Sequence, residues 1–445
     1  MSRSIAVTSA LIFLLAAIGC AGPGTHVGRA TERVSVKKPV QSFTLENGMT
    51  LIVKNTGEGT PTSIQVWVAG GSASDPDGKP GLAHLVEHLL FSGSLHVPKG
   101  RAEQYLEGMG GRLTGNTGRD YSYIGVTLPG EGWDRAMDIL FDLTAYPSFR
   151  ADQVESQKRV VAQEINEDGR EMDDLLMRNF FDESFKVHPY KHPVTGFVKD
   201  TSALTRDDAA FYYSKTYVPS NLALVVVGDV KPGEVRNMAN STFGRLVPVK
   251  SKPSASVQEP YQLYSRTKSV DGPVSLTYMA IGWHICAATD QDIYPIEVLG
   301  AALGEGRGAR LYMELRERMG IVYDVDVDIF PMKDPGVFVI TAQLTDPDVR
   351  RAVDETLRQL DKLKNSPLSA DEIDRALNAI EAARQPGNQP ADDQAYALGY
   401  WATVYGGKEP DGYIDNIRKV TPEDVQRVAQ KYLGAGNYTL SVIRP

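Results

Sequence analysis

An internal repeat is the feature that most constrains the fold of this chain. Thr205-x-x-Asp208 opens a predicted helix that leads to an apolar strand, and Thr421-x-x-Asp424 opens another one 216 residues later. Each pair is typical of a helix-capping box with Asp in place of Glu. A constant offset between such matched elements predicts two copies of one α+β unit.

Composition and charge limit the class of protein. The chain of 445 residues is too long for one hydrophobic core, in agreement with two or more domains. Its hydrophobic content of 42% and charged content of 23% are ordinary for a soluble globular protein. The net charge of −9 disfavours nucleic acid as a partner and weakly favours basic peptides over acidic ones.

Local patterns predict the elements of the first copy. Asn47-Gly48 between two apolar runs indicates a β-hairpin. Residues 63–68 alternate between polar and apolar side chains, which is typical of a half-buried strand. A long helical stretch is predicted from 152 to 185.

A short motif in the first copy has the residues of a metal-binding site. Between Gly81 and Phe91 apolar residues recur with helical spacing, so that His84 and His88 lie one turn apart, with Glu87 beside them. Two neutral imidazoles at this spacing can hold one zinc ion, and a carboxylate between them can take a proton from a zinc-bound water. The order His-x-x-Glu-His is the inverzincin signature. The alternative is a buried helix that carries two histidines by chance.

A glutamate further along the chain extends this motif. Glu164 lies in the run Val160–Ile165, 76 residues beyond His88 and within the predicted helical stretch. The motif and a glutamate at this distance together resemble the insulinase/pitrilysin family of zinc metallopeptidases, in its short two-domain bacterial form. The resemblance implies that His84, His88 and Glu164 hold one zinc ion per chain.

Other glutamates and histidines are candidates for zinc ligands. Glu155 and Glu167 remain alternatives for the third ligand, because Glu164 could also be a solvent-facing helix residue. His188 and His192 follow in a predicted loop. Loop histidines are more often exposed or hydrogen-bonded than metal-bound, so we leave both out of the predicted site.

The second copy has no histidine in the corresponding helix, residues 293–303. Arg316 and Tyr323 follow, seven residues apart, and resemble a C-terminal signature that completes the active site in the family. The resemblance covers roughly residues 41–445 and implies that Tyr323 donates to the developing oxyanion while Arg316 anchors a substrate carbonyl. The alternative is a charged amphipathic helix that ends in a core tyrosine.

Two departures from the family pattern concern the site itself. Gln157 stands seven residues before the third ligand, where the family usually has a glutamate. An amide can orient a ligand but brings no negative charge, so we expect a different zinc affinity or pH dependence. Thr114-Gly115 replaces the usual Asn-Ala of the substrate-binding edge strand, and Asn116 follows two residues after the usual Asn position, on the same strand face. We predict that Thr114, Gly115 and Asn116 contact substrate.

These roles define an expected activity. The fourth position on zinc is left to water, whose pKa falls to about 7, and Glu87 shuttles its proton to the leaving amine of a peptide bond. We expect a metalloendopeptidase that hydrolyses peptides or unfolded segments inside a chamber, with substrate extended along an edge strand. The alternatives are a catalytically silent peptide-binding or assembly subunit of the same fold, and a zinc enzyme that acts on another bond.

The first residues have the character of an export signal. The apolar run 5–19 is too short for a membrane span with its flanks and is typical of a secretory signal. Leu15–Cys20 resembles a bacterial lipobox, which predicts lipidation of Cys20, although Ala17 stands where Leu is usual. Ordinary signal cleavage is the alternative. Ala21 resembles the sorting residue of lipoproteins sent to the outer membrane, so we expect a periplasmic, lipid-anchored protein of the bacterial cell envelope.

The chain divides into five predicted segments. Between the two copies the composition shifts to Pro, Ser, Lys and Val, which is typical of a linker. We predict an α+β protein with two homologous α/β-sandwich domains, each an antiparallel-rich sheet packed with helices. The segments are a signal peptide with lipobox (1–20), a tether (21–41), an N-terminal zinc-binding peptidase domain (42–245), a linker (246–262) and a C-terminal peptidase-like domain without the zinc motif (263–445).

The expected partners follow from the cysteines and from the resemblance. If Cys20 carries lipid, Cys286 has no intramolecular partner and is expected to be a free, buried thiol. Family members of about twice this length build a chamber from two pairs of such units. The resemblance therefore implies a homodimer, or a heterodimer with a related subunit, in which Arg316 and Tyr323 of one chain face the zinc of the other. Contact with a membrane is expected through the lipid anchor only.

Overall fold

The computed structural model describes residues 40–249, 257–383, 389–407 and 412–445. The predicted signal peptide, Cys20 and the tether up to residue 39 lie outside the described residues, so their roles stay predictions. Within the described ranges, no helix combines the length and the apolar character that crossing a bilayer requires.

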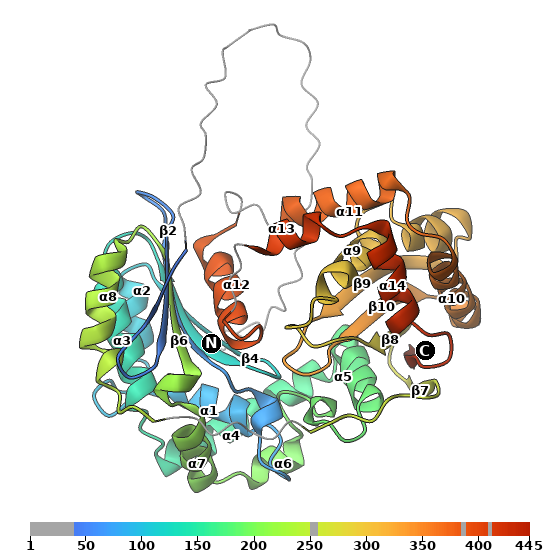
Figure 1. Cartoon of the computed structure of the whole chain (residues 1–445). Coiled ribbons are helices and arrows are strands. Elements are labelled where there is room, and N and C mark those ends of the chain that lie inside the picture. Colours follow the sequence, from blue (N-terminus) through green and yellow to red (C-terminus); the bar gives the residue numbers. More distant parts are fainter. Residues whose placement is uncertain (1–39, 250–256, 384–388, 408–411) are drawn as a thin grey trace, which may run out of the picture. The chain divides into compact units, whose positions relative to one another are not determined.

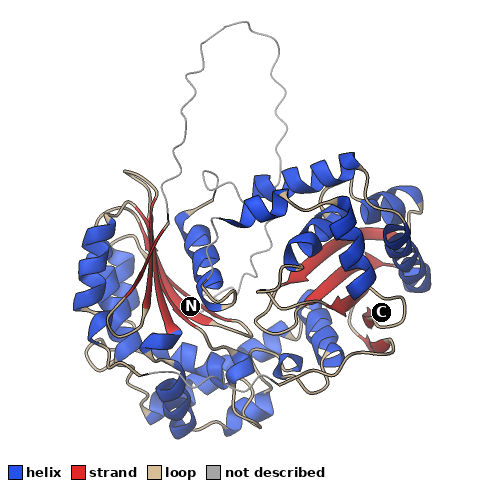
Figure 2. Ribbon diagram, in the orientation of Figure 1, coloured by secondary structure: helices blue, strands red, loops and turns tan. Residues whose placement is uncertain are grey.

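The first copy of the repeat forms a six-stranded sheet (Figure 2). Its strands are β1 (Gln41–Thr44), β2 (Thr50–Asn55), β3 (Thr62–Val68), β4 (Arg112–Thr117), β5 (Ser122–Leu128) and β6 (Leu222–Gly228). They lie in the order β1-β2-β6-β3-β5-β4, and only β2 and β6 run parallel. The strand β4 is therefore an edge of the sheet.

The second copy forms a sheet with the same topology. Its strands are β7 (Arg266–Asp271), β8 (Thr277–His284), β9 (Val322–Phe330), β10 (Val337–Leu344) and β11 (Thr439–Arg444). They lie in the order β7-β11-β8-β10-β9, with β7 and β11 parallel. With β1 set aside, each sheet arranges its strands in the same chain order, so the predicted internal repeat is confirmed.

Helices pack on both sheets (Figure 1). In the first copy they are α1 (Leu82–Phe91), α2 (Arg101–Gly108), α3 (Trp133–Ala145), α4 (Ala151–Asp168), α5 (Met172–Ser184), α6 (Val198–Ala203), α7 (Arg206–Thr216) and α8 (Pro232–Ser241). In the second copy they are α9 (Ile293–Gly304), a π-helical segment (Tyr312–Arg318), α10 (Val349–Asn365), α11 (Ala370–Ala383), α12 (Ala391–Thr403), α13 (Tyr413–Arg418) and α14 (Pro422–Tyr432).

Both predicted capping boxes are present at the matched helices α7 and α14. The Thr205 hydroxyl accepts the backbone N–H of Asp208 at 3.2 Å, and the Asp208 carboxylate accepts the N–H of Thr205 at 2.9 Å. Thr421 and Asp424 make the same pair of bonds, each at 3.2 Å. These bonds satisfy backbone donors that the first turn of a helix leaves free.

The prediction of one continuous helical stretch from 152 to 185 is wrong, because the structure has two helices there, α4 and α5. α4 ends at Asp168, and the N–H of Gly169 still reaches the carbonyl of Ile165 at 3.2 Å. Glu171 then adopts extended backbone angles before α5 begins. Helical periodicity continues across the break, so the sequence pattern alone does not reveal that α5 takes a new direction.

The two copies exchange one helix each. α5 packs on β8 and β11 of the second sheet, and α12 packs on β3 and β6 of the first sheet. Figure 1 shows green α5 beside the yellow and orange strands, and red-orange α12 against the first sheet. Each of these helices stands fifth among the α- and π-helices described for its own copy. The exchange is therefore reciprocal.

Contacts at the first sheet explain why α12 fits there. Trp67 of β3 is fully buried against α12, and a Cβ on Gly399 would lie only 2.0 Å from the indole ring. The carboxylate of Asp392 accepts hydrogen bonds from Ser63 and Gln65 on the same strand, at 3.0 and 2.9 Å. The strand predicted to be half-buried is therefore buried on both faces.

We expect Gly399→Ala to destabilise the protein. The added methyl group overlaps the ring of Trp67, and overpacking of this kind costs about 1–3 kcal/mol. Gly233→Ala in α8 is the matched control, because a Cβ there meets nothing within 4 Å. Chemical denaturation measures both. Equal stability of the two variants would contradict the packing of α12 on Trp67.

Candidate metal centre

The helix α1 is held at its start by a carboxylate from outside the helix. Gly81 precedes α1 with a φ of 90° and provides no side-chain cap. Asp75 accepts the N–H groups of Gly81 and Ala83 at 2.8 and 2.7 Å instead. Burial raises the pKa of this carboxyl to about 7, although the hydrogen bonds lower it. Asp75 belongs to no motif in the sequence, because its role depends on how its loop folds back on the helix.

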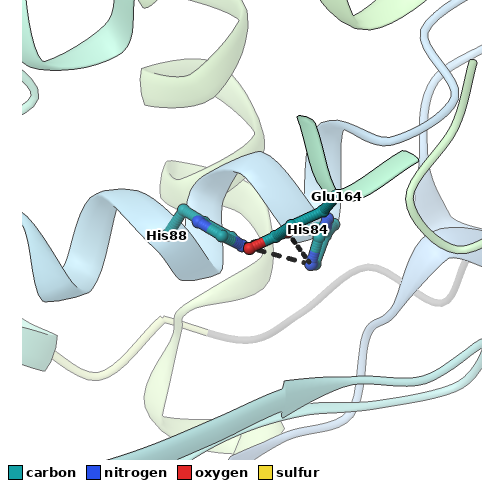
Figure 3. Close-up of side chains that lie close together, drawn as sticks. All are labelled: His84, His88 and Glu164. Carbon is teal, nitrogen blue, oxygen red and sulfur yellow. Dashed lines mark hydrogen bonds and ion pairs between the residues drawn. The ribbon is translucent and has the colours of Figure 1, made fainter. Parts of the chain in front are cut away.

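Three side chains from α1 and α4 converge on one point (Figure 3). Glu164 Oε2 lies 3.2 Å from His88 Nε2 and 3.8 Å from His84 Nε2, and the two imidazole nitrogens are 3.2 Å apart. Two histidines and a carboxylate are the ligands of many catalytic zinc sites, with a fourth position left open. The donor set and its spacing therefore fit a zinc ion.

The alternative third ligands do not join this cluster. Glu155 is 63% exposed and binds Lys158 at 2.9 Å. Glu167 accepts a hydrogen bond from Gln163 on the exposed face of α4. His188 is buried and lies 3.2 Å from a carboxylate oxygen of the second copy. Among the described residues, only His84, His88 and Glu164 form a group with the spacing of a metal site.

Burial and the charge of Glu164 shift the pKa values of the two histidines in opposite directions. Burial lowers the pKa of His84 to about 3, so this imidazole is neutral and able to bind metal. Burial also lowers the pKa of His88, but the hydrogen bond and charge of Glu164 outweigh it and the net shift is upward. Protons and a metal ion therefore compete for His88, because an imidazole binds metal through an unprotonated nitrogen.

Gln157 orients His88. Its Oε1 lies 3.3 Å from His88 Nδ1, which must carry the hydrogen because an amide oxygen only accepts. This leaves Nε2 of His88 free for the metal. The amide nitrogen of Gln157 donates to Ser92 at 2.8 Å, which fixes its orientation. Gln157 thus contacts His88 without adding a negative charge to the site.

Glu87 lies beside the three ligands in the interior. Its side chain is 6% exposed, and burial raises its pKa to about 7, against the opposing effects of His88 and of a hydrogen bond from Thr117. That bond, from the Thr117 hydroxyl to Glu87 Oε2, is 2.6 Å long. Thr117 is not among the site residues predicted from the sequence, although strand alternation places it on the same face of β4 as Gly115.

The edge strand β4 approaches α1 closely because residue 115 is glycine. A Cβ on Gly115 would lie 2.6 Å from the ring of Phe91 and 2.8 Å from Glu87 Oε1. Thr114 and Asn116 alternate with Gly115 and so lie on the opposite face of the strand. Of the three predicted substrate-binding residues, Gly115 is therefore the one next to Glu87.

Arg316 and Tyr323 lie in the second copy and, within the described ranges, are not bonded to the residues around Glu87. Arg316 sits over the ring of Tyr312 at 5.0 Å and lies 3.9 Å from Asp324. Tyr323, on the edge strand β9, is 56% exposed. In the part of the chain that the structure describes, neither makes a hydrogen bond or an ion pair with the residues around Glu87.

Known proteins resemble this chain along most of its length. The model of the insulinase family, peptidase family M16, matches residues 50–196, and a model described as the peptidase M16 inactive domain matches residues 203–380. An uncharacterized zinc protease of Streptomyces coelicolor is 25% identical over 91% of this chain and 90% of its own. The zinc protease PqqE of Helicobacter pylori is 25% identical, over 91% and 93%.

A solved structure has the same fold. The crystal structure of a protease from Helicobacter pylori gives a TM-score of 0.85 at 23% identity and covers 92% of this chain and 100% of that chain. The predicted fold class is thereby confirmed. This chain belongs to the insulinase family of peptidases, family M16, in its short two-domain form. The first family match contains His84, Glu87, His88 and Glu164.

We expect Glu164→Ala to lose zinc, because two histidines alone leave the site one ligand short. Metal analysis after dialysis measures the loss. Glu155→Ala and Glu167→Ala are the matched controls on the same helix and should retain one zinc ion per chain. Retention of zinc by Glu164→Ala together with its loss from either control would assign the third ligand to that control position.

Proposed function

We propose that this protein is a zinc metalloendopeptidase that hydrolyses peptides or unfolded segments. The observation that supports this most directly is the convergence of His84, His88 and Glu164 beside the buried carboxylate of Glu87. Membership of a peptidase family and relatives named zinc proteases support it further. A silent peptide-binding subunit remains the second candidate, since the family model that matches residues 203–380 is described as inactive.

Each side chain of the centre has a separate task in the proposed reaction. His84, His88 and Glu164 hold the ion, which when bound polarises a water molecule and lowers its pKa to about 7. Glu87 accepts a proton near the scissile carbonyl and passes it to the leaving amine. Burial raises the pKa of Glu87 to about 7 while the site holds no metal ion, and this favours acceptance of a proton by its carboxylate.

The substrate is proposed to extend along β4. This strand is an edge of the first sheet and lies against α1, next to Glu87. A peptide added to a sheet edge is bound by main-chain hydrogen bonds, with loose demands on its sequence. We therefore expect cleavage of many extended peptides rather than of one motif.

We expect Glu87→Gln to keep its zinc and to lose at least about 100-fold in kcat, since a general base contributes roughly 10²–10⁴-fold. Digestion of a peptide library, with and without a chelator, measures the activity, and metal analysis measures the zinc. Glu155→Gln on the exposed face of α4 is the matched control and should behave as wild type. Full activity of zinc-loaded Glu87→Gln would refute the assignment, and a wild type that cleaves no peptide would favour the silent subunit.

We further propose that a second copy of the chain completes the site. Arg316 and Tyr323 make no bond to the metal centre of their own chain within the described residues, and Tyr323 is largely exposed. In a two-fold dimer each centre would meet these two residues from the partner. The same geometry allows a heterodimer with a related subunit.

Subunit exchange tests this arrangement. A mixture of Glu87→Gln and Tyr323→Phe chains forms mixed dimers. Each site takes Glu87 from one chain and Tyr323 from the other, so one site of a mixed dimer contains both substitutions and the other site contains neither. Random exchange should therefore restore about a quarter of wild-type activity from two poorly active parents. Exchange is verified by tagging the two chains differently. Activity that stays at the average of the parents despite exchange would place the complete site within one chain.

A further inference from the structure

The bond between Thr117 and Glu87 connects the edge strand to the buried carboxylate. Thr117 ends β4, is 7% exposed, and donates its hydroxyl hydrogen to Glu87 Oε2 at 2.6 Å. A hydroxyl has one hydrogen to donate. The neighbouring hydroxyl of Ser122, 3.1 Å from that of Thr117, must therefore act as the donor where these two bond to each other, or donate to the carbonyl of Gly70 at 3.2 Å.

The two oxygens of Glu87 consequently have different surroundings. Oε2 accepts the hydroxyl hydrogen of Thr117, whereas Oε1 lies on the side of β4 where Gly115 has no side chain, and a Cβ there would be only 2.8 Å from Oε1. A carboxylate on a long side chain in a buried site has several rotamers, and a charge-assisted hydrogen bond to one oxygen selects among them. The strand thus fixes which oxygen stays free.

We propose that Thr117 is a positioning residue, whose hydroxyl holds Oε2 of Glu87 so that Oε1 remains free to accept the proton beside a substrate on β4. This inference rests on the proposed peptidase function. It assigns to β4 a second task besides the binding of peptide: the same strand orients the general base. A displacement of β4 would therefore move the substrate and the base together.

The test compares three variants of the full-length, zinc-loaded protein. Thr117→Val has nearly the same shape without the hydroxyl, and we expect kcat to fall by about 10- to 100-fold while KM changes less than about threefold, because a hydrogen bond to a charged group is lost. Thr117→Ser keeps the hydroxyl and should recover most of kcat. Thr144→Val is the matched control: Thr144 is also buried, on α3, and its hydroxyl donates to the carbonyl of Leu140 in the same helix.

Zinc content and melting temperature separate positioning from damage to the fold. Both should be alike in Thr117→Val and Thr144→Val. A kcat of Thr117→Val close to wild type, or a loss that Thr117→Ser does not recover, overturns the proposal.

A crystal structure of zinc-loaded Thr117→Val gives a readout that does not depend on activity. We expect the carboxylate of Glu87 to rotate away from its wild-type position. An unmoved carboxylate overturns the proposal even if the wild type cleaves no peptide, whereas a wild type without activity but with a displaced Glu87 in the variant overturns only the proposed function.

Discussion

Burial of α1 is the constraint on which the metal centre depends. Leu82, Leu85 and Leu89 are fully buried, and each such side chain contributes about 1.5–3 kcal/mol relative to an exposed one. This apolar anchoring carries His84 and Glu87 into an interior where an unpaired charge is costly. The polar groups around them, from Glu164 on α4 to Thr117 on β4, compensate for that cost. Stability and chemistry are thus coupled through one helix.

Local signals in the sequence were sufficient for much of the fold and for part of the site. The capping boxes at Thr205 and Thr421 were predicted because each depends on residues three positions apart. The spacing of His84 and His88 identified the metal helix for the same reason. Glu164 was reached only through the resemblance to a family, because its distance to α1 depends on how two separate helices pack.

Contacts between distant elements could not be predicted in this way. Asp75 and Thr117 each act on α1 from another element. Asp75 belongs to no pattern along its own segment, and the alternation of β4 places Thr117 on the face of Gly115 without indicating that α1 packs against that face. The alternation in β3 predicted one buried face, yet Ser63 and Gln65 on the polar face bond to Asp392 of α12. Nothing within β3 indicates that a helix from the other copy covers it.

The exchange of α5 and α12 has a consequence for biosynthesis. The last strand of the first sheet to be made, β6, ends at Gly228, but α12, which packs on β3 and β6, ends only at Thr403. Until then an apolar surface that binds other unfolded chains remains open. While the residues between β6 and α12 are made, the uncovered face of the first sheet favours aggregation, and we expect the first half to depend on a chaperone for that part of translation.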